Sequence, residues 1–403
     1  MADLAPTTVN RDRAIHSLTG NCAACGSSTT KTCSGCADAS LVVGLDKTFY
    51  CGHDCQKTGW AAHKKTCKDL KARKPLYQAG DLLRKLWLVY RPNIIIVDVE
   101  KVEVQDRVIT FWESVGETAY AERPFAHHLF SDDRIKESVL SAGACGDATF
   151  NMRRFVLDML HGMCDEMEEI TVKIKNPLRI VRDFRRFADD PTYREIACNR
   201  CQLDSMGNAV FENNGGTPDW QHQVFRVRLR ATKEYFVIDL TNAQYGRYDS
   251  VIPWNDYLEE RVNVVKELGP LGTYDESKIG GLKDESGTCY STENNIRYLD
   301  LVQFYQARMR FELTKWRAEN NLDYNSLLEL NKAGFDEKSQ QLADHISSAL
   351  AGLREAAFRS GDYAMNWRTT SDPEECGKIR TQHLKFLASH KIASRAAELK
   401  NWW

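Results

Sequence analysis

The stretch that decides the fold of the N-terminal region reads CAACGSSTTKTCSGC over residues 22–36 and YCGHDCQKTGWAAHKKTC over residues 50–67. It holds seven of the thirteen cysteines of this 403-residue chain, together with His63 and with His53, which is not in the ligand register. Thiolate and imidazole are the ligands of structural zinc sites, and eight of them suffice for two tetrahedral sites. The eight candidate ligands are Cys22, Cys25, Cys33, Cys36, Cys51, Cys55, His63 and Cys67. The stretch therefore predicts two zinc ions per chain.

The local spacing supports this interpretation. Each Cys-x2-Cys pair fits a tight turn, and the serine and glycine residues around the pairs favour turns. His63 and Cys67 are four residues apart, so on a helix they share one face. A segment of this size cannot bury an adequate core, so the metal must supply much of its folding energy. Spacing alone leaves open whether the ligands pair sequentially or in an interleaved order.

The ligand order resembles that of the MYND zinc finger, with Tyr50 before Cys51, Gln56 after Cys55, and then Trp60. The resemblance implies interleaved ligation. One zinc would be held by Cys22, Cys25, Cys51 and Cys55, and the other by Cys33, Cys36, His63 and Cys67. Residues 37–50, between Cys36 and Cys51, form a longer segment than is usual, and we expect it to include an extended ribbon.

The resemblance also implies a protein-binding role. MYND fingers generally recognise short, often proline-containing peptides, or serve as structural modules. Many occur in SET-domain lysine methyltransferases, but the Asn-His-Ser type motif and the Gly-rich cofactor segments of that domain are absent from this sequence. The whole chain loosely resembles fungal MYND-finger proteins with a long C-terminal region. That likeness is carried by residues 222–257, with Asp239, Gln244-Tyr245-Gly246 and Pro253-Trp254.

The composition excludes several classes of protein. Hydrophobic residues make up 42% of the chain, charged residues 27%, and the formal net charge is −2, which is typical of a globular protein and not of a disordered one. With no signal peptide or 18-residue apolar run in the sequence, we expect no membrane association and a cytoplasmic or nuclear location. Basic residues gather between Lys57 and Lys74, which we interpret as a solvated helix face, so nucleic acid is not an expected partner. The sequence does not specify an oligomeric state.

The hydrophobic pattern predicts an α+β fold: a two-zinc cross-brace finger, a central mixed α/β domain with antiparallel strands, and a C-terminal helical region. Pro92 should end a helix that includes Ala79 to Tyr90, and another helix should span Asp147 to Met167. We expect a flexible arm (1–20), the finger with its exit helix (21–75), the central domain (76–268), a linker (269–289) and the helical region (290–403).

A second constellation combines Cys145, His222 and Asp239. Cys145 should lie at a helix start, with Asp147 as a cap, where the helix dipole favours a thiolate. The order Cys, His, Asp resembles that of papain-like and transglutaminase-like cysteine enzymes. In an enzyme, Cys145 would be the nucleophile, His222 the base and Asp239 the group that orients the imidazole.

Strand geometry tests this idea. If residues 224–230 and 234–240 pair so that their apolar side chains share one face, His222 and Asp239 fall together on the other face. A tight turn near residues 231–233 offsets the two residues by two to four positions, and an offset of four, about 13 Å, is too far for contact. Otherwise Cys145 is a small core residue, His222 a polar residue at a strand end, and Asp239 an ion-pair partner of Arg226 or Arg228. Protein interaction is the leading hypothesis, and a cysteine hydrolase or acyltransferase is the alternative.

Overall fold

The computed structural model describes residues 19–36, 48–95, 98–115, 125–187, 190–198, 201–203, 209–211, 221–273 and 293–359. Several of the expected segments therefore lie wholly or partly outside the described residues. These are residues 1–18 of the arm, the segment 37–47 between two ligand pairs, residues 274–289 of the linker, and residues 360–403 of the helical region.

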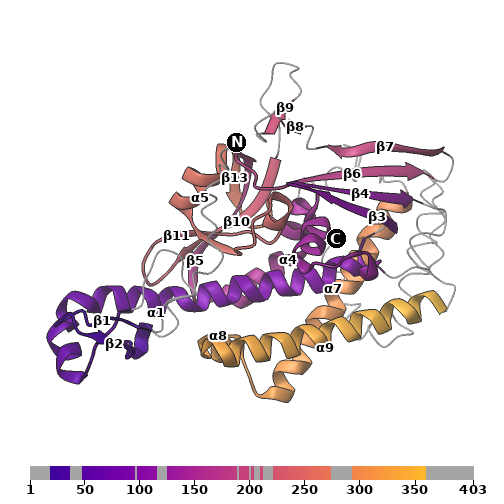
Figure 1. Cartoon of the computed structure of the whole chain (residues 1–403). Coiled ribbons are helices and arrows are strands. Elements are labelled where there is room, and N and C mark those ends of the chain that lie inside the picture. Colours follow the sequence, from indigo (N-terminus) through magenta and orange to yellow (C-terminus); the bar gives the residue numbers. More distant parts are fainter. Residues whose placement is uncertain are drawn as a thin grey trace.

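The finger is a small unit built on the first half of one long helix. Two short strands, β1 (Gly20–Asn21) and β2 (Ser28–Thr29), pair antiparallel, and the 3-10 turn η1 spans Ser34–Cys36. Helix α1 runs from His53 to Tyr90, which makes it about 57 Å long at 1.5 Å per residue. It passes the expected boundary at Pro75 without a break, so the exit helix and the first helix of the central domain are one element. The finger lies at its outer end, away from the sheets (Figure 1).

The central sheet has five antiparallel strands in the order β12-β11-β10-β5-β13. Their bounds are Cys164–Ile174 (β5), Gln221–Leu229 (β10), Tyr235–Ile238 (β11), Val251–Pro253 (β12) and Val262–Pro270 (β13). One face packs on α1 and on α4 (Cys145–Leu160). The other face packs on α5 (Trp254–Arg261) and the 3-10 turn η5 (Asn242–Tyr245). Most of β13 is exposed, but both faces are covered around His222 and Asp239, which are shielded from water.

A second sheet has four strands in the order β3-β4-β6-β7. Their bounds are Asp98–Gln105 (β3), Val108–Val115 (β4), Ile180–Phe187 (β6) and Asp190–Cys198 (β7). The β4–β6 pair is parallel, whereas the other two pairs are antiparallel. Around this sheet lie η4 (His127–Leu129) and α3 (Asp133–Ser141), and β8 (Cys201–Leu203) pairs separately with β9 (Ala209–Phe211). The fold is α+β, as the sequence predicts.

The C-terminal helices pack on the inner half of α1. They are α7 (Glu293–Asn320), α8 (Tyr324–Glu329) and α9 (Lys332–Arg359). The Tyr90 hydroxyl donates to the carbonyl of Val302 at 3.0 Å, and the Lys85 ammonium lies 2.9 Å from the Ser339 hydroxyl. Helix α1 thus lies between the five-stranded sheet and this helical layer (Figure 1). Among the described residues, no helix is long and apolar enough to cross a bilayer.

Two element boundaries differ from the expectation. The helix predicted to reach Met167 ends at Leu160, because Gly162 adopts a φ of +83° that turns the chain into β5. Helix α1 ends just before Pro92 as predicted, and Pro92 lies within the 3-10 turn η3 (Arg91–Asn93) that follows. The alternating residues from Ile94 predict a strand there, but Ile94 caps the 3-10 turn and β3 begins at Asp98.

Candidate functional site

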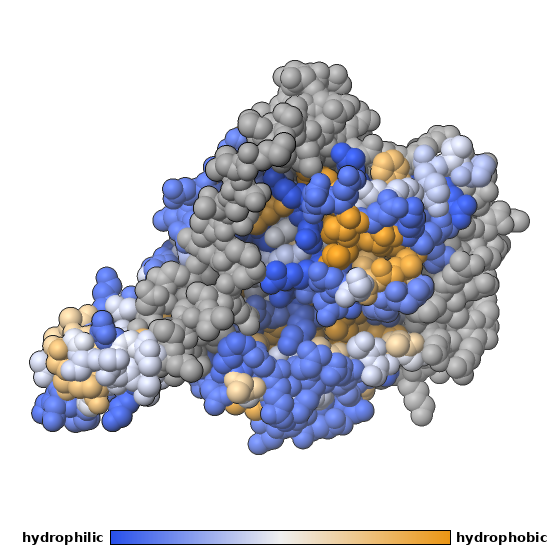
Figure 2. Space-filling view, viewed as in Figure 1, coloured by the Kyte–Doolittle hydropathy of each residue, from blue (hydrophilic) through white to orange (hydrophobic). Residues whose placement is uncertain are grey.

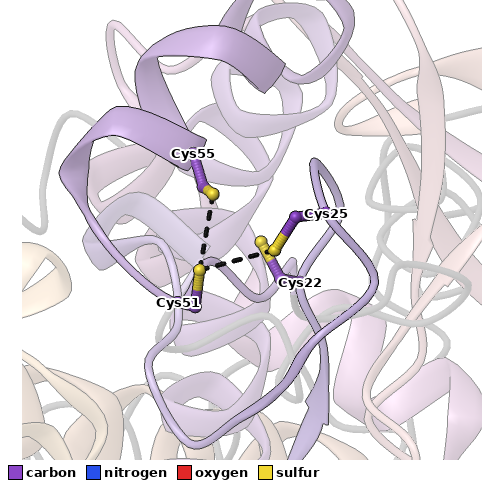
Figure 3. Close-up of side chains that lie close together, drawn as sticks. All are labelled: Cys22, Cys25, Cys51 and Cys55. Atoms are coloured by element: carbon purple, nitrogen blue, oxygen red, sulfur yellow. Dashed lines mark hydrogen bonds between the residues drawn. The ribbon is translucent and has the colours of Figure 1, made fainter.

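The first metal-binding tetrad joins the β1–β2 turn to the start of α1. Gly26, with a φ of +76°, shapes the turn that carries Cys22 and Cys25, and its N–H donates to the carbonyl of Cys22 at 2.8 Å. Cys51 lies just before α1 and Cys55 in its first turn. The Cys51 sulfur is 3.6 Å from that of Cys25 and 3.4 Å from that of Cys55 (Figure 3). All four sulfurs converge on one point from two separate segments.

The second tetrad joins η1 to the next turns of α1. Cys33 and Cys36 are brought together by the 3-10 turn, and His63 and Cys67 lie on one face of α1 as their spacing predicts. The sulfurs of Cys33 and Cys67 are 3.9 Å apart, and the Cys36 sulfur is 3.2 Å from His63 Nε2. The four side chains are buried, so water cannot screen them from one another.

The donor sets fit zinc. In a tetrahedral site with Zn–S bonds near 2.3 Å, ligand sulfurs lie about 3.8 Å apart. Within each tetrad the ligand atoms all lie within 4.8 Å of one another. The interleaved grouping is the one implied by the ligand order, and the sequential grouping that spacing left open is not formed. The chain therefore has two sites that fit two zinc ions.

Electrostatics explain why a cation is needed. The hydrogen bonds of Cys51, Cys25 and Cys22 raise the pKa of the Cys55 thiol to about 12. In the other tetrad, burial and the nearby Cys33 and Cys67 raise the pKa of Cys36 well above its usual range. Crowded thiols resist simultaneous ionisation. A divalent cation removes this repulsion and stabilises the thiolates that it binds.

Side chains beside the second tetrad hold its ligands in place. The Gln56 amide donates to the Cys33 sulfur at 3.6 Å. The rings of Tyr50 and Trp60 contact the His63 ring edge-on, with centroids 5.8 and 6.0 Å away. Trp60 is nevertheless 40% exposed. It is therefore a surface side chain positioned by a zinc ligand.

The second constellation predicted from the sequence also comes together. Asp239 and His222 are both fully buried, and His222 Nε2 lies 2.8 Å from Asp239 Oδ2. The other carboxylate oxygen, Oδ1, accepts the N–H of Thr241 at 3.1 Å. Asp239 does not pair with Arg226 or Arg228, which contact Glu168, Asp165 and Glu166. One oxygen of Asp239 therefore holds the imidazole, and the backbone fixes the other.

Cys145 is the first residue of α4 and is half-buried. Its sulfur lies 3.9 Å from the carbonyl of Gln221, next to His222 in β10. The helix cap differs from the expectation. Asp147 lies inside the first turn and pairs with Arg91, and the N-cap is Ala144, because the chain turns at Gly143, where φ is +62°. The α4 N-terminus therefore has no side-chain cap.

The three groups perturb one another's ionisation. Burial alone would lower the pKa of His222, but the Asp239 carboxylate and the Cys145 thiol raise it to about 10. Burial alone would raise the pKa of Cys145, but the hydrogen bond and charge of His222 lower it below that of an ordinary thiol. The pair is thus biased towards thiolate and imidazolium. Nearby Tyr245 and Tyr257 stay neutral, since burial raises the pKa of each phenol well above 10.

Sequence reasoning gave no role to Gln244, which bridges the two sides of this cluster. Its side-chain nitrogen lies 3.4 Å from His222 Nδ1 and donates to the carbonyl of Thr241 at 3.1 Å. Its oxygen accepts the N–H of Gly143 at 3.3 Å, in the turn before Cys145. Tyr245 packs edge-on against the His222 ring, with centroids 5.0 Å apart. The position of Gln244, shortly after Asp239 in the sequence, was the signal that could have pointed to this role.

Comparison with known proteins assigns the N-terminal unit. Residues 22–67 match the family model of the MYND finger. The search of curated proteins and the search of solved structures found no significant match. The resemblance of the whole chain to fungal MYND-finger proteins and the papain-like order of Cys145, His222 and Asp239 stay predictions. The matched residues and the two ligand tetrads together identify residues 22–67 of this chain as a zinc-binding MYND finger.

Proposed function

We propose that this protein recruits a partner protein through its MYND finger, which binds a short segment of that partner, and that the larger body is a scaffold or regulatory domain. The observation that carries the proposal is the pair of tetrads within the matched family region. MYND fingers generally mediate protein interaction. Seven metal-binding thiols suit a reducing compartment, so we place the protein in the cytoplasm or nucleus.

Trp60 is the side chain best placed to contact a peptide. It is 40% exposed, and its ring rests against His63 of the second zinc site. Tryptophan is enriched at the energetic centres of interfaces, where its large rigid surface is buried at little entropic cost. Figure 2 shows the finger as a protruding lobe on which apolar and polar residues mix. A partner could reach this lobe without contacting the sheets.

The attachment of the finger suits a scaffold. Arg73 of α1 pairs with Glu234 in the β10–β11 turn, and Gln78 donates to the carbonyl of Leu330 at 3.1 Å. Leu82 and Leu86, further along the same helix, are fully buried in the main core. A bound partner would therefore be held in a defined position relative to the body.

The test is peptide binding by the full chain loaded with zinc. A display library of short proline-containing peptides is selected on the wild-type protein, and selected peptides are measured by fluorescence anisotropy. We expect Trp60→Ala to weaken binding at least tenfold, because loss of a hot-spot aromatic costs about 2 kcal/mol or more. The matched control is Phe311→Ala, which removes a 60% exposed aromatic from α7.

Two results would contradict the proposal. Equal affinity of Trp60→Ala and wild type would place the peptide elsewhere and overturn this surface. Selected peptides that bind equally well after zinc removal by a chelator would overturn recruitment by the folded finger.

A further inference from the structure

We propose that Cys145, His222 and Asp239 form a catalytic site that transfers an acyl group through a thioester on Cys145. The acyl donor would be an ester, thioester or amide, and the acceptor water or an amine. This activity lies in the central domain and is independent of peptide binding by the finger.

The first argument is the buried His222–Asp239 pair. Taking an imidazole and a carboxylate fully out of water is costly, and replacing such a pair by apolar residues often leaves stability unchanged or increases it. Here the carboxylate is held at both oxygens, at 2.8 and 3.1 Å. Its hydrogen bond to Nε2 leaves Nδ1, which lies 3.4 Å from the Gln244 amide nitrogen, as the ring nitrogen available to the neighbouring Cys145 thiol. This is the orientation that a base next to a nucleophile requires.

The second argument is the contrast between two cysteines of the same domain. Cys164 is buried in the core, and burial raises its pKa to about 12, as expected of an inert structural thiol. Cys145 is half-buried and contacts His222, and the N–H groups of Gln223 and Gly146 further favour its thiolate. A structural role for Cys145 would need neither the contact with His222 nor a lowered thiol pKa.

The third argument is the surroundings of the thiol. The first-turn N–H groups of α4 have no side-chain cap, so they can donate to an oxyanion that forms beside Cys145. Gln244 connects His222 to the Gly143 turn and acts as a positioning residue. Further from the ring, the Arg261 guanidinium contributes a positive charge near Asp239 and is itself paired with Asp249. Nucleophile, base and oxyanion donors thus meet at one helix end.

The reaction balances in two steps. The Cys145 thiolate attacks the carbonyl carbon, an S–C bond forms, and the carbonyl electron pair moves to oxygen. The pair returns as the bond to the leaving group breaks, and His222 gives its proton to that group, which leaves a thioester. Water or an amine then loses a proton to His222 as it attacks the thioester carbon, and the C–S bond breaks to restore the thiolate.

The test uses the full chain loaded with zinc and p-nitrophenyl acetate as acyl donor. We expect a burst of about one p-nitrophenolate per chain and an acetyl group mapped to Cys145 by peptide mass spectrometry. Cys145→Ala should abolish the burst, whereas the matched control Cys164→Ala should keep it. An acetyl group distributed over lysines, or a burst that survives in Cys145→Ala, would overturn the proposal.

A second measurement reports on the thiol without turnover. The rate of alkylation of Cys145 by iodoacetamide is followed against pH. The midpoint of this pH profile gives the thiol pKa, whereas the rate at one pH also depends on the nucleophilicity of the thiolate. We expect a midpoint below the ordinary value of about 8.5 in the wild type and near it in His222→Asn. Zinc content and circular dichroism check that the variant is folded. An ordinary midpoint in the wild type would refute the thiolate–imidazolium pair.

Discussion

Gly35 tests whether the second tetrad is a metal site of fixed geometry. It lies in η1 between two ligands, Cys33 and Cys36. A Cβ atom added at Gly35 would meet the Cys67 sulfur at 2.5 Å and Lys71 Cε at 2.7 Å. The lysine can move away at little cost, because it is exposed and flexible. The sulfur cannot move freely if it is bound to zinc.

The size of the conflict can be worked out from these distances. An ordinary contact begins near 3.4 Å, so the sulfur would have to retreat by about 0.9 Å. Zinc–ligand bonds tolerate a displacement of about 0.2 Å. The substitution is therefore incompatible with the four-ligand site unless the backbone shifts. Zinc binding supplies about 10–16 kcal/mol in small zinc-binding peptides, so the loss of even a tenth of it lowers affinity about tenfold.

The assay is competition with a coloured zinc chelator, which counts the ions and ranks their release. We expect wild type to hold two zinc ions, with one of them released at least tenfold more readily from Gly35→Ala. The matched control is Gly52→Ala, because a Cβ at Gly52 meets no atom within 4 Å and its φ of −167° suits any residue. Two ions held with wild-type affinity by Gly35→Ala would refute the tetrahedral arrangement.

Three further predictions concern the finger, the second sheet and the core. Cys33→Ala should lose one zinc ion by metal analysis, whereas Cys164→Ala should retain both, because only the first residue is a ligand. Burial and Glu113 raise the pKa of Asp183 to about 8 from 3.8, so the unfolded chain binds fewer protons between these values and stability should fall as pH rises through them. Asp183→Asn should flatten this slope in urea titrations at pH 4–8. Leu86→Ala, at a fully buried position of α1, should lower the free energy of unfolding by about 2–5 kcal/mol without loss of zinc.

The finger was predictable because its ligands are encoded in local spacing. The Cys-x2-Cys pairs and the His63-x3-Cys67 pair act through one turn or one helix face, and the resemblance supplied the interleaved pairing. The parallel pairing of β4 with β6 was not predictable, because the two strands are separated by more than sixty residues of sequence and nothing local records their contact. The continuity of α1 through Pro75 is likewise set by packing. Beyond that residue, α1 is buried between the five-stranded sheet and the C-terminal helices.

The hairpin of β10 and β11 shows where sequence reasoning reached its limit and how the structure resolves it. The pattern required His222 and Asp239 to share a face, but their separation depended on the turn. Phe225 pairs with Ile238, and Lys233 takes a φ of +59° to close the turn. In this register the position opposite Asp239 is Val224, two residues from His222, so the shorter of the two possible offsets is realised and the side chains meet. A turn longer by two residues would have kept the same buried apolar face and separated the pair.

The same register has a consequence for Cys145, which no strand pattern could place. Because His222 lies at the open end of β10, its ring is next to the end of α4 that carries the thiol and the uncapped N–H groups. One further pair along the strand would put the ring at the position of Val224, which is buried in the apolar cluster with Tyr245 and Tyr257. The position of the turn in the chain, not the identity of the three residues alone, therefore decides whether the buried His222–Asp239 pair can act on the thiol of half-buried Cys145.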